Sequence, residues 1–525
     1  MRQAHDWRRL AALGFCVVAV IVGFVLGEGY IDRLPHHAGY FLVAVEDEVR
    51  VPLPTRPRHT AFIVVDGLRR DSAETMHVAQ ELARRGQCRI SDQGSFTVSR
   101  PGYALLSTGL EADRTGSRNN DLTAPLAAES IWQVARASGL HVAGSSHLRW
   151  FAQLFPEGFD RFAHEKDHRA NVFLPEGGEL YDVNVFHPLY VDEAAHQHGA
   201  ASPEYAAAVA RVDGESGGLL ARLDLSQDLV VLTADHGHRD AGGHGGAQPE
   251  IKNVLVCFAG RGVEPRADRA AFDGRSTAPA LAVLLGLRFP RHMRAGDDGL
   301  DVLWEIAHAT PENAAYLEDR RAAVERFRTK NRITLEQWLG DQPGTWPRLY
   351  AREAGAQNKR IGAVSIFVLV AAALSFRMRK VPLRAALGTM AWVAFGAFVV
   401  WCVHHAVLGD FDFTVINLRE RFIPRAGAVA LVSALATVFA HARIVSDRRR
   451  LAGDVVLLVG LLLAAMLGHV YVYGWPLGFP LPPQPARYFP FFGAIALVTY
   501  ALVAAGLLLL AARRARARPS TDLAW

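Results

Sequence analysis

Cysteine is scarce in this chain, which has 4 cysteines in 525 residues. None of them forms a CxxC pair, so a zinc site built from thiolates is excluded. Cys88 and Cys257 lie in strand-like apolar segments, where buried free thiols are the favoured expectation. Pairing of these two in an oxidising compartment is the alternative.

The chain also lacks blocks of lysine and arginine interleaved with aromatic residues, although its formal net charge is +5. Such blocks are typical of nucleic-acid grooves, so nucleic acid is not an expected partner. Most of the excess positive charge comes from arginines beside apolar runs, and this pattern indicates the orientation of membrane-spanning segments.

Long apolar runs are present, and they are confined to the N-terminus and the last third of the chain. Leu10–Gly27 carries no charge and follows Arg8 and Arg9, which predicts an uncleaved anchor over residues 1–27, with a signal peptide as the alternative. Further runs predict a five-span helical transmembrane domain over residues 360–525. These runs are Ile361–Phe376, Ala385–Leu408, Ala426–Ala440, Val455–Tyr473 and Phe491–Ala512.

Three basic segments fix the expected orientation of these spans. They are Arg377–Arg384, Arg443–Arg450 and Arg513–Arg518, and each falls on the same side if all six spans cross the membrane. Basic loops stay in the cytoplasm. We therefore predict a multi-pass protein of the inner (plasma) membrane, with both termini cytoplasmic and the middle of the chain periplasmic.

Residues 28–310 alternate strand-like and helix-like segments. Strands are expected at His59–Val65, Gly139–Ser146, Leu229–Thr233 and Lys252–Ala259, and helices at Ser72–Arg85 and Ser130–Ser138. This alternation predicts an α/β domain with a mostly parallel sheet and helices on both faces, in which ligands bind at the carboxyl ends of strands. Residues 311–359 are polar and helix-prone, which predicts a solvated helical linker.

Three segments carry side chains suited to metal and phosphate chemistry. Asp66 ends an apolar run and precedes a glycine, which alone is more typical of a turn. Ser99 precedes a Pro-Gly step and an apolar helical stretch, so it is either a helix N-cap or a nucleophile. Asp192 and His196 are four residues apart, which places both on one helix face.

A fourth segment, Leu229–Gly246 (LVVLTADHGHRDAGGHGG), is the most informative. Asp235 and His236 end a buried strand, and His244 follows in a glycine-rich loop. Neighbouring side chains on a regular strand point to opposite faces, so both reach one site only where Gly237 breaks the strand. Carboxylates with imidazoles favour divalent metal ions, zinc first and manganese as the alternative.

Together these segments resemble the alkaline phosphatase superfamily. The resemblance rests on VVDG, SRPGYALLSTGL, GSRNN, DEAAH and TADHGHRDAGGHGG, and covers about residues 59–290. The nearest branches are the membrane-bound ethanolamine phosphate transferases of glycosylphosphatidylinositol (GPI) anchor synthesis and the nucleotide pyrophosphatase/phosphodiesterases. The resemblance implies an alkaline-phosphatase-like catalytic domain over residues 28–310.

It also implies roles for individual residues. Two divalent ions would be bound, one by Asp66, Ser99, Asp235 and His236, the other by Asp192, His196 and His244. Ser99 would be the nucleophile, with Thr97 as the alternative, because the phosphodiesterase branch usually has threonine. Asn120 would hydrogen-bond a phosphoryl oxygen, with Asn119 as the alternative.

Four further residues lie near these motifs. His238 is the alternative ligand in place of His236 or His244, or it lies beside the site without binding a metal ion. His187, His198 and Glu193 are expected to have no role in binding or catalysis.

The implied reaction transfers a phospho-headgroup, phosphoethanolamine from a lipid such as phosphatidylethanolamine, through a phosphoryl-Ser99 intermediate to a hydroxyl of a glycan or lipid acceptor. The alternatives are a phosphodiesterase or nucleotide pyrophosphatase that uses water at the same site, and a metal-depleted pseudoenzyme or lipid-transport module. The sulfatase branch is disfavoured because Gly67 and Gly102-Tyr103 replace residues that its motifs require.

Overall fold

The computed structural model describes residues 42–94, 96–117, 120, 122, 124–173, 178–294 and 300–332, with 337, 359, 366, 395–396, 398–406 and 427–436. The chain divides into two compact units, one of which comprises residues 33–343 and 478–484. The predicted anchor and most of the C-terminal apolar runs lie outside the described residues. In the part of the chain that is described, no helix is long and apolar enough to cross a membrane.

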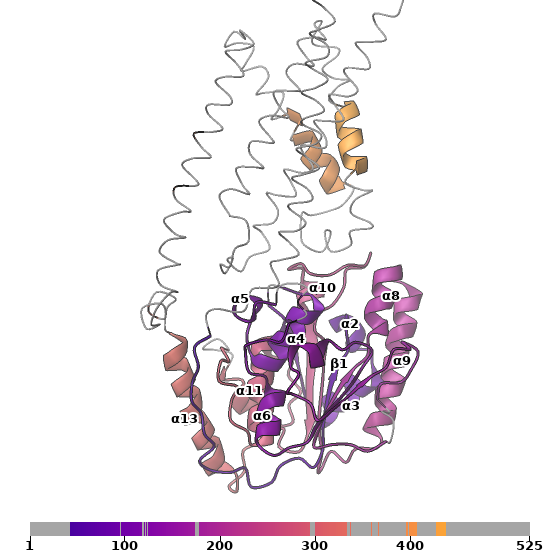
Figure 1. Cartoon of the computed structure of the whole chain (residues 1–525). Coiled ribbons are helices and arrows are strands. Elements are labelled where there is room, and N and C mark those ends of the chain that lie inside the picture. The colour runs from indigo at the N-terminus through magenta and orange to yellow at the C-terminus, as the bar shows by residue number, and fades with distance from the viewer. Residues whose placement is uncertain are drawn as a thin grey trace, which may run out of the picture. The chain divides into compact units, whose positions relative to one another are not determined.

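A β-sheet forms the centre of the α/β domain (Figure 1). It has eight strands, in the order β4-β3-β5-β1-β6-β7-β2-β8. The strands are β1 (Thr60–Val64), β2 (Gly86–Asp92), β3 (Val142–Ser146), β4 (Arg161–His164), β5 (Val183–His187), β6 (Leu229–Thr233), β7 (Asn253–Gly260) and β8 (Ala271–Asp273). In this spatial order, the first five strands (β4, β3, β5, β1 and β6) are each parallel to the next one. Strand β7 runs antiparallel to both of its neighbours, β6 and β2. The predicted mostly parallel sheet is confirmed.

Helices cover both faces of this sheet. They are α2 (Arg70–Ala73), α3 (His77–Arg85), α4 (Ser99–Thr108), α5 (Ala112–Thr115), α6 (Ile131–Ala137), α7 (Trp150–Leu154), α8 (Tyr190–His198), α9 (Pro203–Leu220), α10 (Pro249–Lys252), α11 (Thr277–Leu285), α12 (Leu303–Ile306) and α13 (Ala314–Asn331). Figure 1 shows α4, α6, α11 and α13 on one side and α2, α3, α8 and α9 on the other. The helix expected over Ser72–Arg85 is divided between α2 and α3.

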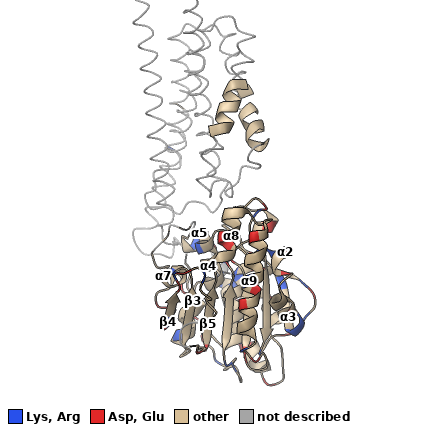
Figure 2. Cartoon of the chain, turned by 90° about the vertical axis from the view of Figure 1, so that its right-hand side faces the viewer, with Lys and Arg blue, Asp and Glu red and all other residues tan. Residues whose placement is uncertain are grey.

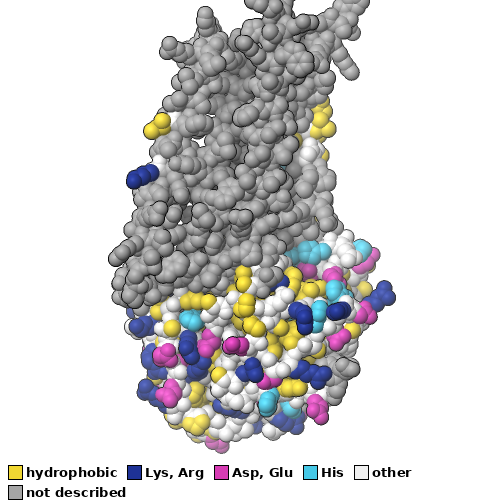
Figure 3. Space-filling model, viewed as in Figure 1, with side chains coloured by type: hydrophobic (Ala, Val, Ile, Leu, Met, Phe, Trp, Pro, Cys, Tyr) yellow, Lys and Arg dark blue, Asp and Glu magenta, His cyan; other side chains and the backbone are white. Residues whose placement is uncertain are grey.

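The central strand β1 is buried on both faces. Phe62 and Val64 pack into one hydrophobic cluster, with α4, α6 and α11, whereas Ala61 and Ile63 pack into the other, with α3, α8 and α9. Successive side chains of a strand point to opposite faces, so a strand covered twice is apolar throughout. Charged side chains of both signs are intermixed on the outer face shown in Figure 3, as is typical of a solvated surface.

Helix α13 corrects the expectation of a solvated arm after residue 310. Its residues Tyr316, Leu317, Ala323, Val324 and Phe327 are buried in the core cluster of the domain. The buried Arg320 guanidinium also pairs with the carboxylate of Asp47 at 2.9 Å. Charged residues are so frequent in this helix that its narrow apolar stripe is hard to recognise from the sequence.

The structure also corrects the expectation of free thiols at Cys88 and Cys257. These residues are directly opposite each other on the antiparallel strands β2 and β7, and they form a disulfide. A sequence separation of 169 residues conceals a pairing that depends on the order of the strands.

Candidate metal centre

The carboxyl ends of three adjacent parallel strands bring the predicted ligands together. Asp66 follows β1, and Asp235 and His236 follow β6, which pairs with β1. Strand β5, on the other side of β1, leads into α8, which carries Asp192 and His196. Helices α4, α5 and α8 lie at this same end of the sheet (Figure 2).

Two glycines allow these segments to approach closely. The Gly237 N–H donates to the Ile251 carbonyl at 2.7 Å, and a Cβ at this position would lie 2.2 Å from the Glu250 carbonyl oxygen. Gly67 has φ +69°, and its Cβ would lie 2.9 Å from Asp192 Cα. Both positions therefore require glycine. Strand β6 already ends at Thr233, so the strand stops before Asp235 and His236 and not at Gly237 as expected.

The first predicted ligand set meets at one atom, His236 Nε2. This nitrogen lies 3.3 Å from Ser99 Oγ, 3.5 Å from Asp66 Oδ1 and 3.3 Å from Asp235 Oδ2. All four side chains are buried. Ser99 is the first residue of α4 and Val98 is its N-cap, so the helix-cap alternative for Ser99 is wrong.

The second predicted set also comes together. His196 Nε2 lies 3.3 Å from Asp192 Oδ2 and 3.0 Å from His244 Nε2, and His244 Nε2 lies 3.7 Å from Asp192 Oδ1. Two nitrogens bound to one tetrahedral zinc ion are separated by about 3.3 Å. These separations therefore fit three ligands of one ion.

His238 belongs to the same cluster, but its geometry differs. Its Nε2 lies only 2.6 Å from Asp192 Oδ1, which is a hydrogen-bond distance rather than the separation of two ligands on one ion. This contact favours the expectation of a neighbour that orients Asp192. His238 as a further metal ligand is the alternative, because Asp192, His196, His238 and His244 together satisfy the distances of a metal-binding group.

The two sets lie side by side. Asp192 also groups with Asp66 and His236, with ligand atoms within 4.8 Å of one another. The rings of His236 and His244 stack with centroids 3.8 Å apart. One elongated site thus contains both predicted ligand sets.

Three buried atoms test whether metal ions fit this site. Asp66 Oδ1, Asp235 Oδ2 and His238 Nδ1 have no hydrogen-bond partner among the described residues. A buried polar atom without a hydrogen-bond partner costs about 1–3 kcal/mol, and more where the group is charged. Divalent cations would remove that cost, so the donor set fits them.

The electrostatics of the site agree with this assignment. Burial raises the pKa of Asp235 well above its usual value, and the carboxylates of Asp66 and Asp192 raise it further. Burial lowers the pKa of His236 to about 3 and that of His244 well below its usual value. Neutral imidazole is the form that binds metal ions. The clustered carboxylates and neutral imidazoles are therefore suited to bind a cation.

Thr97 and His244 hold each other in place. The Thr97 hydroxyl donates to the Gly246 carbonyl at 2.7 Å, and His244 Nδ1 lies 2.9 Å from the Thr97 carbonyl oxygen. His244 therefore carries its proton on Nδ1 and turns the Nε2 lone pair toward the cluster. Because the Thr97 hydroxyl is engaged elsewhere, Ser99 is the better placed nucleophile.

Asn120 is fixed beside Ser99, the predicted nucleophile. Its Oδ1 accepts the N–H of Arg100, the residue after Ser99, at 3.0 Å. A backbone donor requires oxygen at that position, so the Asn120 amide NH₂ is the group left for a ligand. The alternative residue, Asn119, lies outside the described residues.

Sequence reasoning missed Tyr103 and set aside His187. Both contact Asp66: the Tyr103 hydroxyl donates to Oδ2, and His187 Nε2 lies 3.1 Å from the same oxygen. Burial raises the pKa of Tyr103 well above its usual value, with Asp66 adding to the effect, so the phenol stays protonated. Recognition of β5 as a strand would have placed His187 at this edge of the sheet.

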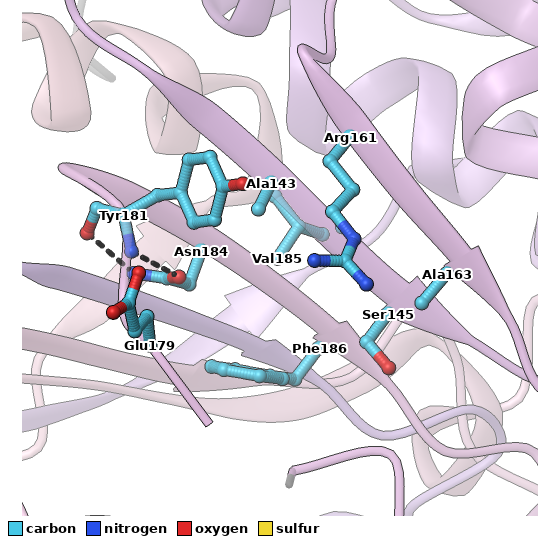
Figure 4. A pocket seen from close by; sticks show the side chains of 10 residues that line it. Ala143, Ser145, Arg161, Ala163, Glu179, Tyr181, Asn184, Val185 and Phe186 are labelled. Carbon is cyan, nitrogen blue, oxygen red and sulfur yellow. Dashed lines mark hydrogen bonds between the residues drawn. The ribbon is translucent and has the colours of Figure 1, made fainter. Parts of the chain in front are cut away.

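One separate cavity lies over strands β3, β4 and β5 (Figure 4). Its polar lining includes Ser145, Arg161, Glu179 and Asn184, and none of the metal-centre residues lines it. The Asn184 amide is already bonded to the backbone of Tyr181 in both directions. The cavity therefore shows no set of polar groups directed at a common ligand.

Residues 153–248 match the family model of the type I phosphodiesterase / nucleotide pyrophosphatase family. The chain is 23% identical over 276 residues to GPI ethanolamine phosphate transferase 3, catalytic subunit, of Mus musculus, covering 45% of this chain and 25% of that protein. It is 22% identical over 336 residues to GPI ethanolamine phosphate transferase 2, catalytic subunit, of Homo sapiens, covering 56% and 33%. The chain therefore spans about a quarter to a third of the length of these curated relatives.

Among solved structures, human ectonucleotide pyrophosphatase / phosphodiesterase 5 aligns with a TM-score of 0.39 and 12% identity, covering 47% of this chain and 99% of that one. The sequence matches confirm the predicted resemblance: the chain is similar to enzymes of the phosphodiesterase and GPI-type transferase groups.

Proposed function

We propose that this chain is a metal-dependent phosphotransferase that moves phosphoethanolamine from a lipid such as phosphatidylethanolamine to an acceptor hydroxyl, through a phosphoryl-Ser99 intermediate. The observation that carries the proposal is the convergence of the buried Ser99 hydroxyl and the carboxylates of Asp66 and Asp235 on His236 Nε2. The headgroup and a glycan or lipid acceptor are proposed because the matched relatives are named GPI ethanolamine phosphate transferases.

Two divalent ions are proposed, zinc first because the donor set contains several imidazoles, and manganese as the alternative. Asp66, Ser99, Asp235 and His236 would hold one ion, and Asp192, His196 and His244 the other. When bound, such ions lower the pKa of a coordinated hydroxyl and neutralise phosphoryl oxygens.

In the proposed reaction, Ser99 Oγ loses its proton and attacks phosphorus, the bond from phosphorus to the lipid oxygen breaks, and that oxygen takes up a proton and leaves as the lipid alcohol. The headgroup is then held as a phosphodiester on Ser99. An acceptor hydroxyl loses its proton and attacks phosphorus, and Ser99 Oγ leaves and regains a proton. The Asn120 NH₂ group donates to a non-bridging oxygen in both steps, where negative charge accumulates.

The membrane arrangement is part of the proposal. We propose an anchor over residues 1–27, a catalytic domain over residues 28–310 extended by α13, and a five-span bundle over residues 360–525. The catalytic domain would face the periplasm, with both termini in the cytoplasm. The disulfide between Cys88 and Cys257 supports an oxidising compartment.

A second candidate function is phosphodiester hydrolysis, with water in place of the acceptor. The match of residues 153–248 to the type I phosphodiesterase / nucleotide pyrophosphatase family favours it. Every side chain keeps its role, so only the second step distinguishes the two candidates.

Purified full-length protein, incubated with phosphatidylethanolamine labelled in its headgroup, tests the proposal. We expect a phosphoethanolamine adduct on Ser99 by peptide mass spectrometry, and transfer of label to an added glycan alcohol. Release of free phosphoethanolamine without an acceptor would identify the hydrolase. Ser99→Ala should abolish both the adduct and the transfer, with Ser138→Ala at the C-cap of α6 as the control. An adduct on Thr97 would refute the assignment.

A further inference from the structure

The two oxygens of the Asp66 carboxylate have different surroundings. Oδ2 lies 3.1 Å from His187 Nε2 and accepts the Tyr103 hydroxyl. Oδ1 has no hydrogen-bond partner in the described part of the chain and faces His236 Nε2 at 3.5 Å. One oxygen is therefore committed to the protein, and the other is directed into the ligand cluster.

The proton positions follow from the contacts of His187. Ser146 Oγ accepts the Leu148 N–H at 3.0 Å and lies 2.8 Å from His187 Nδ1, so it can donate its own proton to that nitrogen. His187 Nε2 then carries a proton toward Asp66 Oδ2 and Tyr103 Oη, which lies 2.8 Å away. In the other tautomer, two lone pairs would face each other between Nε2 and Asp66 Oδ2, which is repulsive.

Packing holds these donors rigidly. The Tyr103 ring stacks on Phe151 with centroids 4.4 Å apart, and meets His187 edge-on at 4.8 Å. Tyr103 and His187 are almost completely buried. Neither side chain can rotate away from Asp66 without displacing the core around it.

We propose that His187 and Tyr103 are positioning residues that hold Asp66 so that it binds its metal ion through Oδ1 alone. This inference rests on the proposed metal-dependent function. His187 does not bind the ion itself, because Ser146 engages one ring nitrogen and Asp66 with Tyr103 engages the other. Partners of this kind orient ligands, and their loss weakens metal binding by about 10- to 100-fold.

The test compares three variants of the full-length protein by zinc titration against a competing chelator. Tyr103→Phe removes only the hydroxyl, and we expect about 10-fold weaker binding of one of the two ions. A glutamine amide nitrogen reaches the position of Nε2, whereas an asparagine amide nitrogen reaches that of Nδ1. His187→Gln should therefore retain zinc affinity, whereas His187→Asn should lose it.

Tyr316→Phe is the matched control. It removes another buried tyrosine hydroxyl, which donates to the Val283 carbonyl at 2.6 Å between α13 and α11. The rise in Tm caused by zinc should shrink in Tyr103→Phe and stay unchanged in Tyr316→Phe, because binding to the native state raises stability. Zinc X-ray absorption should also change in Tyr103→Phe, since a released carboxylate can bind through both oxygens.

The outcomes separate this inference from the proposed function. If the wild type binds no zinc, the proposed function fails. If the wild type binds two ions and Tyr103→Phe and His187→Asn bind them with unchanged affinity and spectra, only the positioning role is overturned.

Discussion

At the scale of single residues, the site is held by pairs in which one member faces the cluster and the other fixes its orientation. His244 is oriented by the Thr97 carbonyl, and Asn120 by the Arg100 N–H. Ligands held in this way need no reorganisation when an ion or substrate arrives. The residue types were recognisable from the sequence, but their partners were not, since most of them are backbone groups.

Asp235→Asn should separate stability from function. In the metal-free protein, burial and the carboxylates of Asp66 and Asp192 disfavour the ionised form of Asp235, and an uncharged asparagine avoids this cost, so we expect the free energy of unfolding to rise by about 1–3 kcal/mol. Turnover and binding of one ion should be lost. Urea unfolding with and without metal measures the change in the free energy of unfolding. Retention of full activity would contradict the site assignment.

His238→Ala should weaken metal binding without removing a ligand. Because the 2.6 Å contact with Asp192 is a hydrogen bond, we expect about a 10-fold loss of affinity and an unchanged number of imidazole ligands in zinc X-ray absorption. His244→Ala, which removes a ligand, is the reference. Loss of one imidazole from the metal in both variants would make His238 a ligand.

At the scale of elements, the site depends on where strands stop and how closely the following loops approach. The loop after β6 passes α10 at Gly237, and the loop after β5 is tied to β3 by His147. The expected strands β1, β3, β6 and β7 were recognised from their apolar runs. Strand β2 was expected only as a strand-like segment around Cys88, and β4, β5 and β8 were missed, because they contain polar residues or are short.

Gly237→Ala should destabilise the domain and impair metal binding. The added Cβ would lie 2.2 Å from the Glu250 carbonyl oxygen, so the loop carrying His236 and His238 must move. We expect a loss of about 2 kcal/mol or more in thermal or urea unfolding. Gly214→Ala on α9 is the control, because its added Cβ would meet no atom within 4 Å. This substitution should raise the free energy of unfolding by about 0.5–1 kcal/mol.

His147 should contribute a pH dependence to stability. Burial lowers its pKa from 6.5 to about 4, and its ring accepts the Leu189 N–H while donating to the Ala170 carbonyl. The neutral form stabilises the native state at neutral pH, and this contribution falls as pH drops from about 6.5 through 4. Across that range the stability difference between wild type and His147→Asn should shrink by about 2 kcal/mol, and a constant difference would contradict this role.

At the scale of the whole α/β domain, distant segments are joined on both faces of the sheet. The disulfide joins β2 to β7, and the buried Asp47–Arg320 pair joins the start of the domain to α13. The disulfide persists in the unfolded chain and restricts it, because the two cysteines are 169 residues apart, whereas the ion pair acts only in the folded domain. The ion pair and the buried apolar residues of α13 explain why this helix belongs to the domain although its composition is that of a solvated helix.

Removal of the disulfide by the double substitution Cys88→Ala with Cys257→Ala should lower the free energy of unfolding by about 2–4 kcal/mol. Metal binding should persist, because neither cysteine belongs to the ligand cluster. Unfolding curves of oxidised wild type and the double variant measure the loss. Equal stability, or free thiols in the protein purified from its own compartment, would contradict the pairing.

The sequence alone was enough to predict metal and phosphate chemistry and the regions that would supply it. The motifs that contain Asp66, Ser99, Asp192, Asp235 and His244 are local, so residue type and spacing reveal them. Only the tertiary structure decided which atoms meet. The order of the strands sets the disulfide, the packing of α13 and the contacts of His187 and Tyr103 with Asp66, and no local pattern records which strands become neighbours.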